Sequence, residues 1–422
     1  MKQVLPVILL LLVILISEAT YSQNNSSPYS IIGIGDIENG SFDRTSGMAN
    51  TGLALSSGRF LYQANPASYS SLDDHFFNFE ISSRVKVVTY AGQSINSNLN
   101  DQSSDFQFKR LSLAIKIKPR WAVSMGLMPF STSNYSFFAN KAIAGTNFSV
   151  PAYEEGTGST NLAYITNSYK ISKNLSIGLQ AAYLFGQLEQ KETIPPTSAS
   201  DSALITTRNI VLTNPYFKLG LQYHKKINTK WVIAAGATGS LQTNLNTSTD
   251  ITATSGNSTL VSIASYKSGV FKLPVTYSGG LAATLKDKFT FAADYNFQSW
   301  SSLHYSGLGY SLENTNRYSV GFEYSKKIKY KNQIFGERYY FQGGLFYSDS
   351  YLSMNGKQIN QFGGTIGAGF IPLRYADLAI MGGLEIGKRG TSSYGLIREN
   401  YSQFTFTITY RNFWLTKIKR YD

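Results

Sequence analysis

The chain has no cysteine and only three histidines. Without cysteine there can be no disulfide, no thiolate metal site and no lipoprotein anchor. The histidines, His75, His224 and His304, are scattered and lack the spacing of metal ligands. His304 beside Ser301 and Ser302 is the nearest approach to a base with a nucleophile, and no orienting acid accompanies it. The sequence therefore predicts a protein that is not an enzyme and that holds no metal and no cofactor.

Charge and long apolar runs are also scarce. Charged residues make up 15% of the chain, against roughly 25% in a typical soluble domain. After residue 22 no apolar run approaches the ~20 residues that a transmembrane helix needs, so a membrane-bound mature chain would have to cross as strands. The net charge of +13 is spread over short turns, whereas a nucleic-acid binder gathers its basic residues in one patch. We expect contact with anionic lipid head groups and no nucleic-acid partner.

Residues 1–22 have the pattern of a secretory signal peptide. Lys2 provides the positive start, residues 4–16 the apolar run, and Thr20 and Ser22 the small residues before a cut ahead of Gln23. The alternative is a membrane anchor, but the apolar run is shorter than a membrane-spanning helix requires. Removal of this segment takes away one lysine and one glutamate, so the net charge does not change.

Aromatic residues and glycine are abundant, with 29 Tyr, 26 Phe and 36 Gly. Between residues 76 and 414 about fourteen strand-like segments are joined by two alternating kinds of connection. Short basic connections lie at residues 118–120, 171–173, 225–230, 286–288, 326–331 and 373–374. Longer connections rich in Ser, Thr, Asn and Gly lie at residues 94–104, 141–157, 191–202, 244–258, 301–314, 350–357 and 388–399. This alternation is typical of a transmembrane antiparallel β-barrel of about 14 strands.

Apolar and polar residues alternate along the segments. In residues 404–410, Phe404, Phe406 and Ile408 alternate with threonines, so the aromatic face would meet lipid and the threonine face the lumen. Similar alternation occurs at residues 175–183, 231–237, 289–297, 318–324 and 378–386. A soluble β-sandwich also alternates, but the signal peptide and the two kinds of connection favour the barrel.

Charged residues fall on the faces opposite the apolar ones. A charge facing lipid at the midplane would cost several kcal/mol, so these residues are expected to line the lumen, with about a third of them near the rims. Both signs occur, which suggests that they hold something inside the barrel. They are Glu80, Arg84, Lys86, Arg110, Asp294, Arg317, Glu323, Arg338 and Glu385.

Residues 23–72 precede the first strand and do not alternate. They are rich in Gly, Ser and Asn, yet Ile31, Leu53 and Phe60 are among many apolar residues with no room for a core of their own. A barrel near 14 strands is wide enough to hold such a segment. We therefore expect three parts: a signal peptide (residues 1–22), a hatch inside the lumen (23–72) and the barrel (73–422).

The hatch carries a resemblance to a known family. Residues 44–55, RTSGMANTGLAL with Arg44 and Gly47, followed by Asn65, Pro66 and Ala67 just before the first strand, resemble the N-terminal hatch of the FadL-type outer-membrane transporters. Residues 28–36 and 294–302 are similar to versions found in gliding and gut Gram-negative lineages of the Bacteroidota. The resemblance covers the whole mature chain, and it implies that both termini lie on one side of the membrane.

The resemblance implies diffusion of a hydrophobic, fatty-acid-like ligand through a pocket, gated by the hatch at Arg44, Gly47 and residues 65–67. It also implies a lateral exit where the third strand is kinked. That strand contains Gly126, Met128 and Pro129, and proline is expected at interrupted pairings. A passive bulge at a strand end is the alternative.

Two functions follow from these expectations. One is a passive channel in the outer membrane of a Gram-negative cell, with lipid and a hydrophobic small molecule as its partners. The other is a non-enzymatic partner or plug of a type IX secretion translocon, in which secretion-system proteins dock and the lumen is closed. An apolar path from the loops to the third strand would favour transport, and a sealed lumen would favour the partner role.

Overall fold

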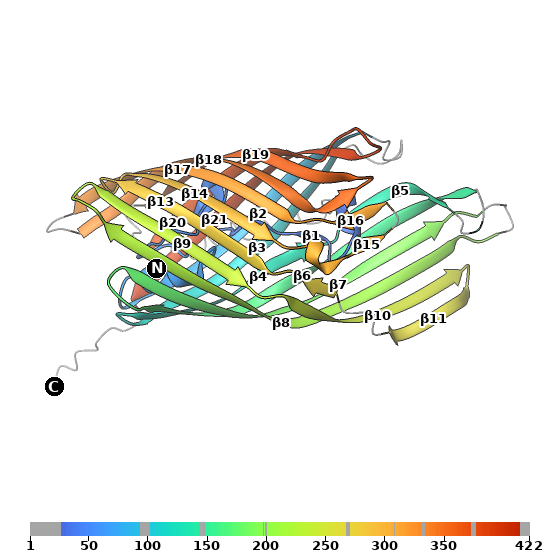
Figure 1. Cartoon of the computed structure of the whole chain (residues 1–422), viewed down its shortest axis with the longest axis horizontal. Coiled ribbons are helices and arrows are strands. Elements are labelled where there is room, and N and C mark those ends of the chain that lie inside the picture. Colours follow the sequence, from blue (N-terminus) through green and yellow to red (C-terminus); the bar gives the residue numbers. More distant parts are fainter. Residues whose placement is uncertain are drawn as a thin grey trace, which may run out of the picture.

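The computed structural model describes residues 27–92, 102–142, 145, 148–196, 198, 201–266, 271–307, 309–330, 334–372 and 377–413. Within them, fourteen antiparallel strands close a barrel (Figure 1). In ladder order these strands are β2 (Phe76–Gly92), β3 (Gln102–Lys118), β4 (Trp121–Thr132), β6 (Ser149–Lys170), β7 (Leu175–Ile194), β8 (Leu204–Lys226), β9 (Trp231–Ser240), β13 (Thr276–Leu285), β14 (Phe289–Gln298), β17 (Thr315–Tyr330), β18 (Ile334–Met354), β19 (Lys357–Phe370), β20 (Leu378–Arg389) and β21 (Ile397–Phe413). Pairing of β2 with β21 closes the ring.

Shorter elements complete the fold. The other strands are β1 (Asp36–Ile37), β5 (Tyr135–Ala142), β10 (Thr243–Ser255), β11 (Ser258–Tyr266), β12 (Phe271–Leu273), β15 (Ser306–Gly307) and β16 (Tyr310–Leu312). The short 3-10 helices are η2 (Pro28–Ile31), η3 (Arg44–Met48), η4 (Pro66–Ser71) and η5 (Ser301–Leu303). Among the described residues, no helix is long and apolar enough to cross a membrane.

The alternation of side chains predicted from the sequence is confirmed. On β21, Phe404 is 45% exposed on the outer surface, whereas Thr407 is 2% exposed inside. Leu281, Leu345 and Ile366 on other strands are each 64% exposed on the outer surface. An apolar belt around a closed barrel is the surface that a membrane barrel presents to lipid.

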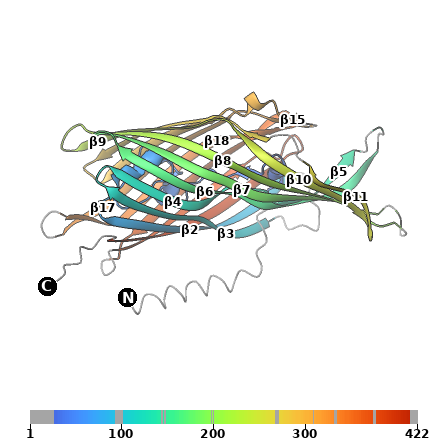
Figure 2. The same cartoon turned by 90° about the horizontal axis from the view of Figure 1, so that it is seen from below.

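Several predicted loops are strands in the structure. Residues 244–258 form most of β10 and the turn into β11, and residues 350–357 are the end of β18 and a tight turn into β19. β5, β6, β7, β8, β10 and β11 pair in that order beyond the closed ring, where β5 and β11 protrude (Figures 1 and 2). The prediction was wrong here because threonine is a strong strand former, and paired strands satisfy their own backbone groups outside a membrane.

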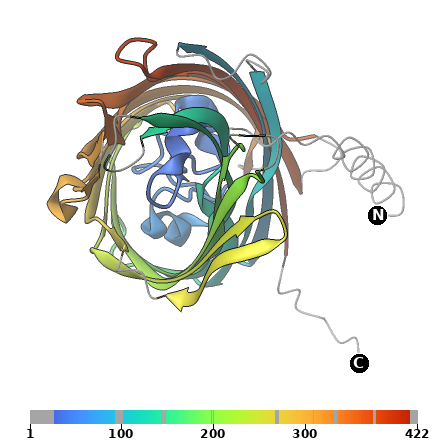
Figure 3. The same cartoon turned by 90° about the vertical axis from the view of Figure 1, so that its right-hand side faces the viewer.

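Residues 27–72, named the inner segment below, lie inside the barrel (Figure 3). The segment starts in the half with the long connections, where the Ser27 amide donates to the Asn134 carbonyl, 2.7 Å away. It ends near the short turns, where β2 begins. Residue 27, the first described residue of this segment, is therefore in the half with the long connections, and Phe413, paired with Phe76, is in the half with the short turns. The two termini themselves lie outside the described residues, so their expected position on one side stays a prediction. The expected signal peptide over residues 1–22 lies outside the described residues.

Candidate functional site

The ladder of the barrel wall is interrupted between β3 and β4. Starting from the end of the barrel that carries the short turns, the two strands pair only as far as Leu111 with Leu127. Beyond that point β3 stays paired with β2, and β4 stays paired with β6. The β4–β6 register is itself irregular between Pro129 and Ser131. Pro129 thus lies at the interruption, as expected for a residue that cannot donate to a ladder.

The two other residues expected at a lateral gate flank the same point. Gly126 is in the last paired stretch of β4, where a Cβ atom would overlap the Tyr164 hydroxyl. The Met128 sulfur lies 3.6 Å from the side-chain nitrogen of Gln63, which donates to it. The inner segment therefore contacts β4 directly at this level.

The inner segment occupies the ladder position that β3 leaves. β1 pairs antiparallel with β4, Asp36 with Thr132 and Ile37 with Ser131. The Glu38 amide then donates to the Phe130 carbonyl at 2.9 Å. Because β6 holds the opposite edge of β4, β1 lies on the side that faces β3. A two-residue strand thus pairs with β4 within the interrupted part of the wall.

Ion pairs fix β1 to the other side of the interruption. The Glu38 carboxylate accepts from Arg84 of β2 at 2.9 Å and from Lys109 of β3. Asp36 accepts from Arg389 of β20 at 2.6 Å. Burial alone would raise the pKa of Glu38, but Arg84 and Lys109 outweigh it and hold that pKa well below its usual range. The carboxylate is therefore ionised at neutral pH, and β1 is fastened to strands on both sides.

A cluster of apolar side chains fills the interior on the side of the long connections. Phe130 of β4 lies with its ring centre 6.1 Å from that of Tyr216 on β8. Trp300, which is 1% exposed, stacks on Tyr351 at 4.7 Å. Other members are Tyr29, Ile34, Leu162, Leu184, Leu188, Leu212, Leu245, Leu273, Leu312, Leu352, Ile359 and Leu396, with Met128 packed against them. The cluster extends from the connections after β14 and β20 to the interruption at Pro129.

Arg44 fastens η3 to the barrel wall. Its guanidinium donates to both oxygens of Glu323 at 2.7 and 2.9 Å, and to both oxygens of Glu337 at 2.5 and 2.6 Å. It also lies over the rings of Phe60 and Tyr340, at 4.4 and 3.9 Å from their centres. Such bidentate, buried contacts are strong and directional, so η3 has a fixed position.

The Asn65-Pro66-Ala67 motif is a second attachment to the wall. The Asn65 side chain accepts from the Ala67 amide at 3.0 Å and donates to the carbonyls of Leu53 and Leu221, each at 2.9 Å. Asn65 is fully buried. It caps the start of η4, the capping role that asparagine commonly has, and it joins two parts of the inner segment to β8.

Inward-facing glycines allow the inner segment to lie directly on the wall. A Cβ atom at Gly47 would overlap the backbone of Gly367 on β19, and one at Gly178 would overlap Pro66. The same holds for Gly220, Gly236, Gly280, Gly321, Gly344 and Gly383 on other strands, which face Asn65, Leu53, Met48 or Ser46. At each of these positions the inner segment therefore lies in direct contact with the barrel wall.

We expect Gly236→Val to displace the inner segment, because its side chain would overlap the Leu53 carbonyl. Overpacking of this kind costs about 1–3 kcal/mol. Gly279→Val is the matched control, since Gly279 lies on the next strand, faces outward and has nothing within 4 Å. Heat-modifiable mobility on gels and single-channel recording should show a less stable, leakier barrel for Gly236→Val. Equal behaviour of both variants would contradict the close contact.

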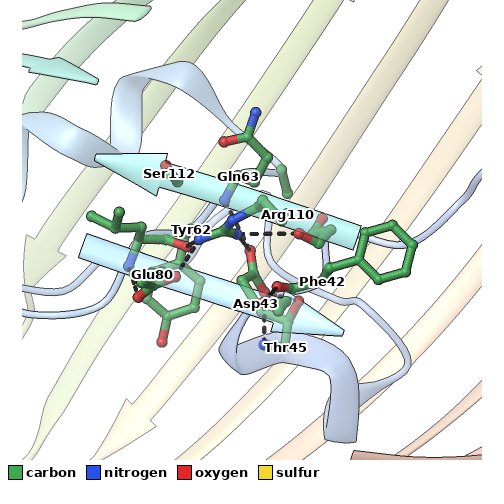
Figure 4. A network of polar contacts seen from close by, with 12 residues as sticks. Phe42, Asp43, Thr45, Tyr62, Gln63, Glu80, Arg110 and Ser112 are labelled. Atoms are coloured by element: carbon green, nitrogen blue, oxygen red, sulfur yellow. Dashed lines mark hydrogen bonds and ion pairs between the residues drawn. The ribbon is translucent and has the colours of Figure 1, made fainter. Parts of the chain in front are cut away.

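A buried polar network joins the inner segment to β2 and β3 (Figure 4). Arg110 pairs with Glu80 and lies 3.5 Å from Asp43. Glu80 also accepts from the Leu61 amide at 3.0 Å. A register shift in the β2–β3 ladder turns both Lys109 and Arg110 inward. Such a bulge breaks strict alternation, which is why the sequence pattern missed Lys109.

The remaining predicted lumen charges lie at different levels. Asp294 accepts from the amides of Gly52 and Leu53 at 2.7 and 3.0 Å. Lys86, Arg317 and Glu385 line a small polar chamber with Arg84 and Arg389. Arg338 is exposed near the short turns and lines a larger cavity there. Most of these charges hold or surround the inner segment, and Arg338 belongs to the rim.

A cavity of about 760 Å³ lies at the turn end, between the inner segment and β8, β9, β13, β14, β17 and β18. Leu55, Phe60 and Ile371 are part of its lining. His224 also lines it, with its Nε2 atom 3.2 Å from the Ser56 hydroxyl. The inner segment thus separates this cavity from the apolar cluster.

The hydroxyls considered as nucleophiles have other partners. Ser301 donates to Asn314 at 2.8 Å, and Ser302 donates to the Ser299 carbonyl at 2.6 Å. Over the part of the chain that the structure describes, no three His, Asp or Glu side chains are grouped to hold a metal ion.

Comparison with known proteins shows which family profile and which solved structures this chain resembles. The sequence profile of the BamG family matches residues 2–422. The toluene transporter TbuX of Ralstonia pickettii superposes with a TM-score of 0.59 at 14% identity, over 91% of this chain and 99% of its own. A FadL homologue of Pseudomonas aeruginosa superposes with a TM-score of 0.56 at 13% identity, over 90% of this chain and 100% of its own. The toluene transporter TodX of Pseudomonas putida superposes with a TM-score of 0.52 at 16% identity, over 90% of this chain and 99% of its own.

At these identities the likeness establishes the fold, which is that of the FadL-type barrels, and the predicted all-β barrel is confirmed. No curated protein matches the sequence.

Proposed function

This chain belongs to the BamG family, and from that premise and its FadL-type barrel we propose that it is an outer-membrane channel for passive uptake of hydrophobic, fatty-acid-like small molecules. In this proposal the short basic turns face the periplasm and the long connections face the exterior. TbuX and TodX, which share the fold, are toluene transporters.

The observation that carries the proposal is the apolar cluster, because it joins the outer connections to the interruption in the wall. A hydrophobic molecule gains free energy when it leaves water for such side chains, by roughly 25 cal/mol per Å² of buried apolar surface. The aromatic and methionine side chains near Pro129 include Phe130 and Met128. These side chains can change their conformation to admit a hydrophobic molecule.

The route leaves through the wall. Below the cluster, Arg44, Asn65 and the glycine contacts hold the inner segment on the barrel wall, and ion pairs fill the middle of the lumen. The shortest strand of the enclosure at this level is β1, which contributes two residues to the ladder. Displacement of β1 would open the interrupted β3–β4 seam to the membrane, and the ligand would leave there.

A disulfide across the seam tests this route in a chain that has no cysteine of its own. Ile37 and Ser131 are partners in the β1–β4 ladder, so the pair Ile37→Cys and Ser131→Cys should lock β1 in place. We expect oxidation to abolish uptake of a fluorescent fatty acid into vesicles and a thiol reductant to restore it.

The control is a pair of cysteines in an uninterrupted ladder, Leu281→Cys with Ala293→Cys, together with each single variant. Oxidation of the control pair should leave uptake unchanged. Full uptake by the locked seam would exclude the lateral route. Absence of uptake by the unmodified barrel would contradict the channel itself.

That last outcome would favour the second candidate, a docking role for a secretion-system protein. Its support is the sheet beyond the ring, where Leu260, Val261 and Ile263 of β11 are exposed.

A further inference from the structure

Basic residues of two neighbouring turns lie side by side on the turn-side rim. Lys118 ends β3 and Arg120 lies in the turn that follows it, and the Lys170 amide of β6 donates to the Arg120 carbonyl at 2.8 Å. This bond places the β6–β7 turn, with Lys173, beside the β3–β4 turn. Both Lys118 and Arg120 are exposed, and across the described ranges neither forms an ion pair with an acidic side chain.

An apolar groove of about 810 Å³ lies on the outer surface directly beside these charges. Its walls come from adjacent strands and include Trp121, Tyr169, Ile177, Leu179 and Leu219. Four of these side chains are between 38% and 57% exposed. Its exposed apolar walls are part of the apolar belt, where lipid acyl chains pack.

The chemistry changes along the groove. Trp121 donates through its ring nitrogen to the Asn167 side-chain oxygen at 3.3 Å, so polar groups are fixed at the rim end. Tryptophan and tyrosine favour this interfacial level, and basic side chains extend from it toward head groups. Apolar walls below a basic rim match a molecule with acyl chains and an anionic head.

We propose that this groove is a binding site for one anionic phospholipid of the turn-side leaflet. Its acyl chain lies against Leu179 and Leu219, and its phosphate is held by Lys118 and Arg120. Basic side chains near the membrane surface attract an anionic head group more strongly than a zwitterionic one. The site is separate from the uptake route, because it lies on the outer face of the barrel at the opposite end of β4.

The test is native mass spectrometry of the folded barrel in detergent, with phosphatidylglycerol or phosphatidylethanolamine of identical acyl chains added. Retention of phosphatidylglycerol should exceed that of phosphatidylethanolamine. The double variant Lys118→Gln/Arg120→Gln should lower it by about tenfold, because each basic side chain contributes to head-group binding.

The matched control is Lys286→Gln/Lys288→Gln, which removes the same charge from the β13–β14 turn on the same rim and should leave retention unchanged. Equal loss in the two double variants would show a general charge effect and would overturn the site. Equal retention of the two lipids by the unmodified barrel would overturn it as well. Heat-modifiable mobility verifies that every variant is folded.

Discussion

Deletion of residues 24–69 is expected to convert the barrel into an open pore. These residues include the parts of the inner segment that contact the glycines of the wall and that carry Arg44 and Asn65. Without them a ring of fourteen strands encloses a polar lumen that fills with water, as in larger barrels. Single-channel recording in planar bilayers should show a steady conductance approaching that of a general porin.

The charges left behind would be hydrated by that water, so the deletion need not unfold the barrel. Heat-modifiable gel mobility identifies the folded fraction, and recordings from the intact protein give the baseline. A folded deletion variant with the conductance of the intact protein would show that the apolar cluster alone closes the lumen, and that the inner segment is not the plug.

Arg44→Ala should be among the most destabilising single substitutions in the chain. Arg44 is 5% exposed at its side chain, and its removal leaves Glu323 and Glu337 facing each other with little access to water. Breaking a buried ion pair by removing one partner costs about 3–5 kcal/mol. The free energy of unfolding, measured by urea denaturation in lipid vesicles, should fall by that amount.

Two further variants identify the cause. Replacing both acids as well, in Arg44→Ala/Glu323→Gln/Glu337→Gln, should restore much of the lost stability, because no unpaired charge remains buried. Arg411→Ala breaks the Arg411–Asp73 pair, in which Asp73 is 51% exposed, and should cost less than about 1 kcal/mol. A small loss for both arginine variants would mean that Arg44 does not hold η3.

The prediction of lumen charges illustrates what a strand pattern can provide. Glu80, Asp294 and Glu323 were predicted to face inward because a period of two leaves no other face for them. Their partners could not be predicted, because pairing depends on how strands are staggered around the ring. Glu323 meets Arg44 across 279 positions of sequence. Lys109 was missed because a bulge turns two neighbouring residues to the same side.

The motif at residues 65–67 also has one feature that follows from the sequence and contacts that the sequence could not predict. The sequence places this motif just before the first strand, and there the Asn65 side chain caps η4. Its contact with the Leu221 carbonyl, and the glycines that receive Pro66, depend on strands that lie far along the chain.

By itself the sequence determined a closed barrel of about fourteen strands, its lipid-facing and lumen-facing sides, and a segment that must be housed inside. These follow from local rules: alternation, turn chemistry, and the cost of exposing polar backbone to lipid. The tertiary structure alone decided that β1 pairs with β4 at the interruption, that the inner segment lies against glycines of the wall, and that an apolar cluster reaches the interruption at Pro129. Those features arise from contacts between distant strands, and strand stagger and bulges set them.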